Sequence, residues 1–204
     1  MDTLKMCILV LFHPREAFYL IKRNREIIKL YQFALIYIVM QLIKLISIYF
    51  ENFTISKVTP SGANLALEIA VVFVPLFAWI ICSFGVTTIW SGEATLSETF
   101  GITMLSLIPY IALKPLLILF SNVLSIGEKG IYEALNLFLL LWVLFLMLLA
   151  LKDANNLSFS KLITISLVSI IAMVILCAVI FMFLALGIQM VTFVTDVIKE
   201  TKYL

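Results

Sequence analysis

The chain has 204 residues, of which 64% are hydrophobic and 13% are charged, and its net charge is +2. Soluble domains are about 45–50% apolar and about 25% charged, so this composition excludes a soluble globular protein and predicts an all-α polytopic membrane protein. The small net charge gives no support for nucleic-acid binding. The three cysteines lie far apart in apolar runs, which supports neither a disulfide framework nor a structural metal.

Residues 1–30 are predicted to form an amphipathic segment in the membrane interface. The apolar run 6–12 is far shorter than the about 20 residues that a helical span needs. In residues 14–29, apolar side chains fall near one helical face, which predicts a basic helix on the anionic inner leaflet. The alternative is that these residues are the polar start of the first span. Pro14 suits the first helical position, and the expected leaflet contacts are Arg15, Lys22, Arg23 and Arg25.

Five apolar stretches follow, each long enough to cross a bilayer, and they predict a bundle of five transmembrane helices. The expected spans are residues 28–50, 64–90, 96–120, 131–151 and 161–186. Residues 187–204 stay compatible with a helix but turn polar. This tail is expected either to protrude from the membrane or to bend near Gly187.

The third span has the least usual sequence. A glycine in a short loop, Gly92, precedes it, and residues 95–98 match the capping box that starts a helix. Pro109 and Pro115 are expected to interrupt the helical hydrogen bonds, and Lys114 stands directly before the second proline. The favoured interpretation is a structural kink. The alternative is a broken helix that lines a substrate site, as in transporters.

The distribution of Lys and Arg predicts the orientation. With the N-terminus in the cytoplasm, eight basic residues lie in cytoplasmic segments and four in external segments, while two lie in the spans. The expected topology therefore has the N-terminus inside and the C-terminus outside. Trp90 fits the inner level of an aromatic belt, and Tyr49 and Tyr132 fit the outer level.

Four ionisable residues are expected at one depth in the outer half of the bundle. Lys44 and Lys114 each lie about six residues, or roughly 9 Å, from the outer end of a span. Glu68 lies about four residues inside its span, and Glu133 lies just inside the fourth. They predict a polar cluster that ties the bundle together or binds a ligand, with Glu68 or Glu133 in reach of Lys114. The alternative is that each side chain reaches the interface independently.

Catalysis is not expected. His13 is the single histidine, and it reads as a helix-start residue at the interface, which leaves little support for a His-based metal site or a Ser–His pair. No two acidic residues lie in mid-span, as an intramembrane aspartyl pair would require. The loops are too short for a nucleotide site, so no cofactor is expected.

Several motifs together resemble the Yip-domain family, five-span membrane proteins named for interaction with Rab-type GTPases. They are the segment 13–18 (HPREAF), the glycine-led passage 91–100, the Pro109-Tyr110 pair, Trp142, and the stretches 149–155 and 160–161. Fewer than 30 residues precede the first span, so the chain is similar to a short bacterial-type member, for which no Rab-type partner is implied. The resemblance implies a non-enzymatic protein of the bacterial plasma membrane that assembles with other membrane proteins.

The expected function is therefore a scaffold or accessory subunit, in one concrete version beside the permease of a carbohydrate ABC importer. One alternative is a small transporter or channel, with the broken third span lining the path. The other is a membrane-shaping or trafficking factor that uses the N-terminal amphipathic segment. The expected partners are the lipid bilayer and another membrane protein.

Overall fold

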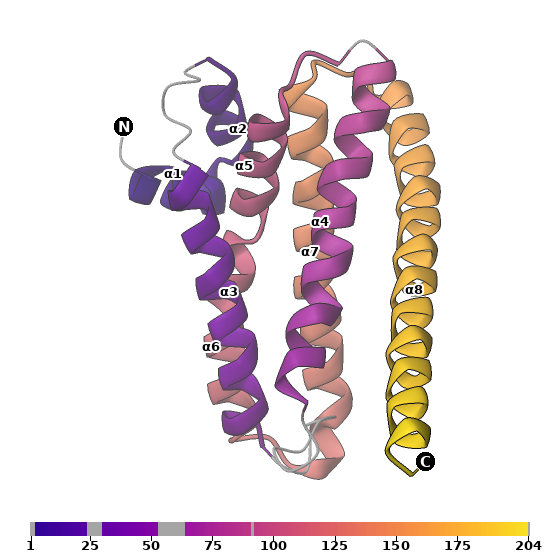
Figure 1. Ribbon diagram of the computed structural model, residues 1–204. Coiled ribbons are helices and arrows are strands. Elements are labelled where there is room, and N and C mark those ends of the chain that lie inside the picture. Colours follow the sequence, from indigo (N-terminus) through magenta and orange to yellow (C-terminus); the bar gives the residue numbers. More distant parts are fainter. Residues whose placement is uncertain (1–2, 24–29, 53–63, 91, 204) are drawn as a thin grey trace.

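The computed structural model describes residues 3–23, 30–52, 64–90 and 92–203, and it shows helices joined by short loops, with no strand in these ranges. The long helices stand side by side, and two short N-terminal helices lie at one end of them (Figure 1). The elements are α1 (Thr3–Phe12), α2 (Pro14–Arg23), α3 (Leu30–Phe50), α4 (Leu65–Ile89), α5 (Leu96–Ser106), α6 (Ile108–Ser121), the 3-10 turn η2 (Ile126–Glu128), α7 (Lys129–Ala154) and α8 (Phe159–Tyr203).

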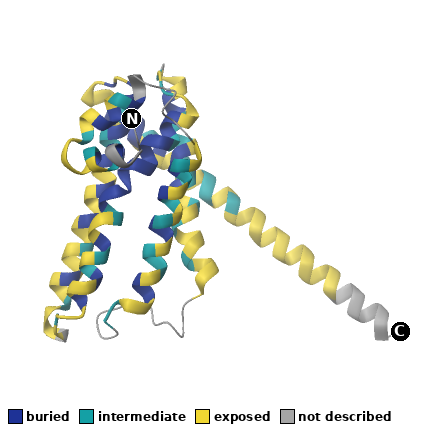
Figure 2. Cartoon of the chain, turned by 90° about the vertical axis from the view of Figure 1, so that its left-hand side faces the viewer, coloured by how far each residue is buried: buried dark blue, intermediate teal, exposed yellow. Residues whose placement is uncertain are grey.

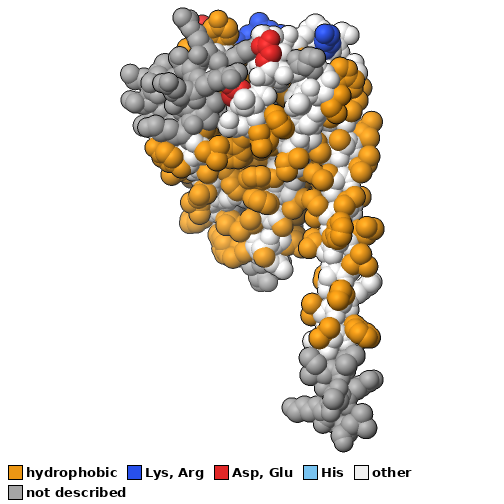
Figure 3. All heavy atoms as spheres, turned by 45° about the horizontal axis from the view of Figure 1, so that its top comes forward, with side chains coloured by type: hydrophobic (Ala, Val, Ile, Leu, Met, Phe, Trp, Pro, Cys, Tyr) orange, Lys and Arg blue, Asp and Glu red, His pale blue; other side chains and the backbone are white. Residues whose placement is uncertain are grey.

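Five helical stretches are long and apolar enough to cross a bilayer. They are α3, α4, the α5–α6 pair Leu96–Ser121, α7, and Phe159–Thr195 of α8. Hydrophobic side chains cover the visible flank of the molecule, and charged side chains gather at its upper end (Figure 3). An apolar flank below a charged end is the surface that a lipid bilayer requires. The predicted all-α bundle of five transmembrane helices is confirmed.

The α5–α6 pair is the most enclosed of the five stretches. All residues from 101 to 109 are buried. Gly101 faces the ring of Phe33, and an added Cβ would lie 3.5 Å from that ring, in ordinary contact. The capping box forms as expected, because the Thr95 N–H donates to Glu98 Oε2 at 2.7 Å and the Glu98 N–H donates to Thr95 Oγ1 at 3.3 Å.

The third span is interrupted at Leu107. The Leu107 N–H donates to the Met104 carbonyl at 3.1 Å, which tightens the last turn of α5. Pro109 then falls in the first turn of α6, where its missing N–H costs no helical hydrogen bond. Pro115 lies inside α6, which continues beyond it to Ser121. The interruption therefore lies at Leu107, directly before the turn that holds Pro109, and not at Pro115.

The N-terminal helices α1 and α2 pack onto one end of the bundle. Met6 and Val10 of α1 are buried, as are Ala17, Phe18 and Ile21 of α2. Helix α2 contacts α7 and α5, and α1 contacts α2, α5 and α6. The amphipathic helix is present, but its apolar face is covered by the rest of the protein instead of lipid, because the upper ends of α5 and α7 offer it an apolar surface.

Helix α8 has 45 residues, so it is about 67 Å long, more than twice the roughly 30 Å of a hydrocarbon core. Near its start it packs against α4 and α7 and buries Leu162, Ile165 and Ser169. From residue 181 to residue 195 every residue is exposed. The helix passes through Gly187 without interruption and diverges from the bundle (Figure 2).

Candidate functional site

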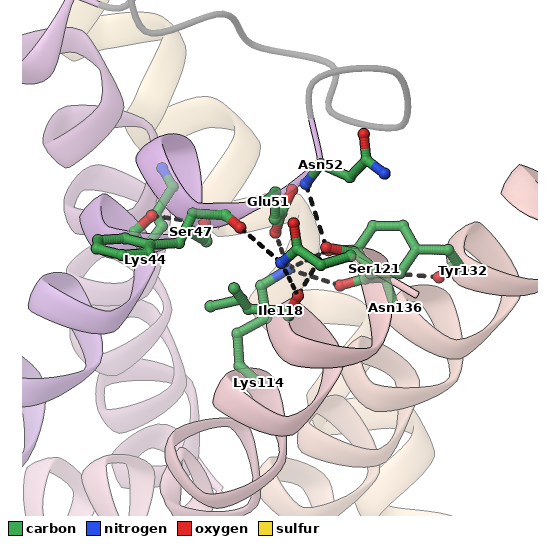
Figure 4. Close-up of polar contacts among 11 residues, drawn as sticks. Lys44, Ser47, Glu51, Asn52, Lys114, Ile118, Ser121, Tyr132 and Asn136 are labelled. Carbon is green, nitrogen blue, oxygen red and sulfur yellow. Dashed lines mark hydrogen bonds and ion pairs between the residues drawn. The ribbon is translucent and has the colours of Figure 1, made fainter. Parts of the chain in front are cut away.

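The Lys114 side chain is the centre of a polar cluster at the end of the bundle opposite α1 and α2. Its ammonium nitrogen lies 2.7 Å from Glu51 Oε1, and it donates to Asn136 Oδ1 at 2.7 Å and to the Tyr132 hydroxyl at 3.4 Å. Polar atoms from the end of α3, from α6 and from α7 thus converge on one point (Figure 4). A lysine has three donors, so these three partners satisfy all of them.

The end of α3 is held against the end of α6 by hydrogen bonds around Ser121. The Asn52 N–H donates to Ser121 Oγ at 3.2 Å, and the Asn122 side chain donates to the Phe50 carbonyl at 3.0 Å. The Glu51 N–H also donates to the Ser47 carbonyl at 2.9 Å, which extends the helical hydrogen bonding beyond Phe50. These contacts position the Glu51 carboxylate beside Lys114.

A second ion pair joins α3 to α4. Lys44 Nζ lies 3.0 Å from Glu68 Oε2 and also donates to the Glu68 carbonyl. One turn earlier on α3, the Gln41 side chain donates to the Ile69 carbonyl at 3.3 Å and contacts the Tyr37 hydroxyl. The Lys44 and Glu68 side chains are 17% and 18% exposed, compared with 9% and 12% for Lys114 and Glu51. The Lys114 pair is therefore the more deeply buried of the two.

The structure arranges the four predicted residues differently from the sequence-based expectation. It brings Lys44 and Glu68 together, but the carboxylate beside Lys114 is that of Glu51, instead of Glu68 or Glu133. Glu133 lies on an exposed position of α7. Sequence reasoning missed Glu51 because the predicted first span ends at residue 50, one residue before it. Its position could have indicated this role, because a carboxylate directly after a helix can fold back onto the last turn of that helix.

Two further members of the cluster were missed. Tyr132 was expected to mark the outer membrane interface, but its side chain is buried at 5% exposure. Asn136 donates to the Tyr132 carbonyl at 2.9 Å, one turn away on α7. The spacing of four residues places both side chains on one face of the helix, which is the signal that could have identified them.

At the opposite end, the α4–α5 loop is fastened to the turn between α7 and α8. The Ala94 N–H donates to Asn155 Oδ1 at 3.1 Å, and the Asn156 side chain donates to Glu93 Oε2 at 3.1 Å. A Cβ at Gly92 would lie 2.6 Å from Asn155 Oδ1, closer than atoms can approach. Gly92, which the sequence places in the loop before the third span, is therefore required because a larger residue would not fit against Asn155.

The residues expected at the inner leaflet lie at this same end. Pro14 is the first residue of α2, and Arg15 is exposed in its first turn. Lys22 and Arg23 are the last residues of α2, and Arg25 falls outside the described residues.

Two titratable groups outside the membrane-spanning stretches have shifted pKa values. Burial raises the pKa of the Cys7 thiol in α1. At Glu128, hydrogen bonds from the Ser125 N–H and hydroxyl lower the pKa of the carboxyl group. In the described part of the chain, no three His, Cys, Asp or Glu side chains come close enough to hold a metal ion.

No curated protein and no solved structure matches the chain. The family model for the Yip1 domain matches residues 8–188. This range runs from α1 into α8 and includes the Lys114 cluster, Gly92 and Asn155. Because the match covers most of a helical bundle whose five apolar stretches suit a bilayer, the chain is a multi-pass membrane protein that belongs to the Yip1 domain family.

Proposed function

We propose that this protein is a non-enzymatic scaffold or accessory subunit that binds another integral membrane protein through α8. The observation that carries this function is the exposure of α8. Only 6% of its most apolar window is buried inside the chain, compared with 28% to 56% for the other four spans. The other spans pack on several neighbours, whereas α8 packs mainly on α4, and every residue from 181 to 195 is exposed.

The length of α8 adds to this evidence. Its apolar part, Phe159–Thr195, has 37 residues and is about 55 Å long, so in a core of roughly 30 Å it must tilt, extend beyond the hydrocarbon, or both. The divergence of α8 from the rest of the bundle seen in Figure 2 fits such a tilt. In lipid, packing against other helices and interhelical hydrogen bonds determine how a helix is held. A partner's helices would supply those contacts along the exposed half.

The polar side chains on that half also favour a protein partner. Gln189 is exposed within the apolar stretch, and it is followed by Thr192 and Thr195. The two threonines donate to the carbonyls of Ile188 and Thr192 on their own helix. The Gln189 amide has several donors and acceptors to satisfy, and in transmembrane bundles such side chains bond to neighbouring helices.

The family resemblance suggests a specific partner and a specific membrane. We propose the permease of a carbohydrate ABC importer as the partner and the bacterial plasma membrane as the location. The exposed basic residues Arg15 and Lys161 lie at the end that carries α1 and α2, and the positive-inside rule then favours a cytoplasmic N-terminus and an external C-terminus.

The two alternative functions have less support. A transport path through the third span would need space at its interruption, but residues 101–109 are all buried. Lys114 has its three donors satisfied, so a substrate would have to displace them. A membrane-shaping role would need the apolar face of α2 to enter lipid, but Phe18 and Ile21 are buried in the protein.

Site-specific photo-crosslinking in native membranes tests the proposed role. A photoreactive residue replaces Phe183, which is 65% exposed on α8, and in the matched control it replaces Phe138, which is 62% exposed on α7. We expect the Phe183 position to give a discrete adduct with a permease subunit, identified by mass spectrometry, and the control to give none. A protein that purifies alone, without an adduct at either position, would contradict the accessory role.

A further inference from the structure

We propose that the junction of α2 with the α7–α8 turn binds the phosphodiester group of an anionic phospholipid. An open pocket of about 430 Å³ lies there, and most of its accessible lining is polar. The lining residues are Arg15, Tyr19, Lys152, Asp153, Asn156 and Leu157.

The charges around this pocket match a singly charged phosphodiester. Arg15 is exposed and forms no ion pair with the residues that the structure describes. Lys152 lies 3.6 Å from Asp153, so its charge is largely balanced by that carboxylate. These three lining groups together carry one positive charge, and the Glu93 carboxylate that accepts from Asn156 is not among the lining residues. The guanidinium of Arg15 can also donate two parallel hydrogen bonds to phosphate oxygens, a geometry that a lysine cannot provide.

Neutral donors complete the lining. Tyr19 lies four residues after Arg15 on α2, so its hydroxyl is on the same helical face. Asn156 adds a side-chain amide, which its hydrogen bond to Glu93 holds in place. Asn156 has a φ of 51°, a left-handed conformation that asparagine tolerates, and this turn keeps it beside the end of α7. The docking of α2 onto α7 therefore assembles the site from two segments far apart in sequence.

The position of the pocket favours a lipid over a free anion. It lies where α7 ends and α8 begins, which is the level at which the spans leave the hydrocarbon. On the first two turns of α8, which follow the lining residue Leu157 in the chain, the apolar side chains of Phe159 and Ile163 are exposed and are available to acyl chains. Basic pockets between helices at the cytoplasmic surface of a membrane bind anionic headgroups.

Lipid binding to the purified full-length protein tests the site. The protein in detergent is titrated with phosphatidylglycerol or with phosphatidylcholine, and bound lipid is counted by native mass spectrometry. We expect phosphatidylglycerol to bind more tightly. Arg15→Gln should weaken its binding by roughly tenfold, the effect of losing a charged hydrogen bond, and Lys152→Gln by about fivefold.

The matched control is Lys161→Gln, which removes an exposed cation from the first turn of α8 outside the pocket. We expect it to change binding by less than about twofold, since a distant surface charge contributes little. Arg15→Lys keeps the charge and should keep the preference for phosphatidylglycerol. The melting temperature of each variant shows that it is folded.

Three results would overturn the assignment. The first is equal binding of phosphatidylglycerol and phosphatidylcholine. The second is unchanged binding by a folded Arg15→Gln variant. The third is an equal, Arg15-dependent stabilisation of lipid-free protein by inorganic phosphate, which would make the ligand a soluble anion. The experiment uses the isolated chain, so its outcome is independent of whether α8 binds a partner protein.

Discussion

At the end that carries α1 and α2, the helices contact one another through apolar side chains and closely packed loops, whereas at the opposite end they contact through ion pairs. Phe18 is buried at the first end, and Gly92 lies against Asn155. At the second end, Lys114 meets Glu51 and Lys44 meets Glu68. Extra helices cover the first end, while charged groups at the second must satisfy one another because little water reaches them.

Breaking the buried ion pair is expected to have the largest effect. Lys114→Met leaves Glu51 buried without its cation, so it should lower the free energy of unfolding by about 3–5 kcal/mol, measured by denaturation in detergent. The exchange Lys114→Glu with Glu51→Lys restores opposite charges and should recover part of the loss. A Lys114→Met protein as stable as the wild type would contradict a stabilising role for the cluster.

Removing the Phe18 ring at the other end should lower the free energy of unfolding slightly less than Lys114→Met does. Phe18→Ala deletes a fully buried ring and is expected to destabilise the protein by about 3 kcal/mol, at the low end for such changes because α2 can partly detach. Hydrogen exchange should then rise in α2 first. Tyr19→Ala, at a 60% exposed position of the same helix, is the control, and an equal effect of both changes would show that α2 is not anchored by Phe18.

The loop contact can be tested with one methyl group. Gly92→Ala places a Cβ 2.6 Å from Asn155 Oδ1 and 2.8 Å from the Thr87 carbonyl, so it should cost about 2 kcal/mol through overpacking. Gly85→Ala is the matched control, since nothing lies within 4 Å of its Cβ. The thermal midpoints of the two variants should differ clearly, and equal midpoints would mean that the loop can move away.

The second ion pair provides the comparison within the polar end. Lys44→Met is expected to cost about 1 kcal/mol, less than Lys114→Met, because both of its charged groups are more exposed and the remaining Glu68 is better solvated. Parallel denaturation of the two variants measures the difference. A larger loss of stability in Lys44→Met than in Lys114→Met would show that burial does not determine which ion pair stabilises the protein more.

The smallest effect is expected in the exposed turn before α7. Hydrogen bonds from Ser125 lower the pKa of Glu128, so the ionised form is favoured in the folded protein. This contribution is present above the pKa of the unfolded carboxyl group and is lost as the pH falls through the folded pKa. Ser125→Ala should therefore lower the melting temperature slightly at neutral pH and not at acidic pH. In the Glu128→Gln background the pH dependence of this difference should vanish.

Some of the Lys114 cluster could be predicted from the sequence. Counting residues from the span ends gives the depth of a side chain, which is why Lys44 and Glu68 were expected at one level. Depth does not give the direction in which a side chain points around its helix, since each residue turns the helix by about 100°. The pairing of Lys114 with Glu51, Tyr132 and Asn136 depends on how α3, α6 and α7 are rotated and packed.

The sequence by itself determined the number of spans, the capping box at Thr95 and the amphipathic character of α2. These are local consequences: a bilayer core requires about 20 apolar residues, and a helix start requires acceptors for its free N–H groups. Only the tertiary structure decided what covers each face. The amphipathic pattern of α2 requires Phe18 to be shielded from water, and either lipid or protein can shield it. Protein covers Phe18 here because the ends of α5 and α7 present an apolar surface to α2.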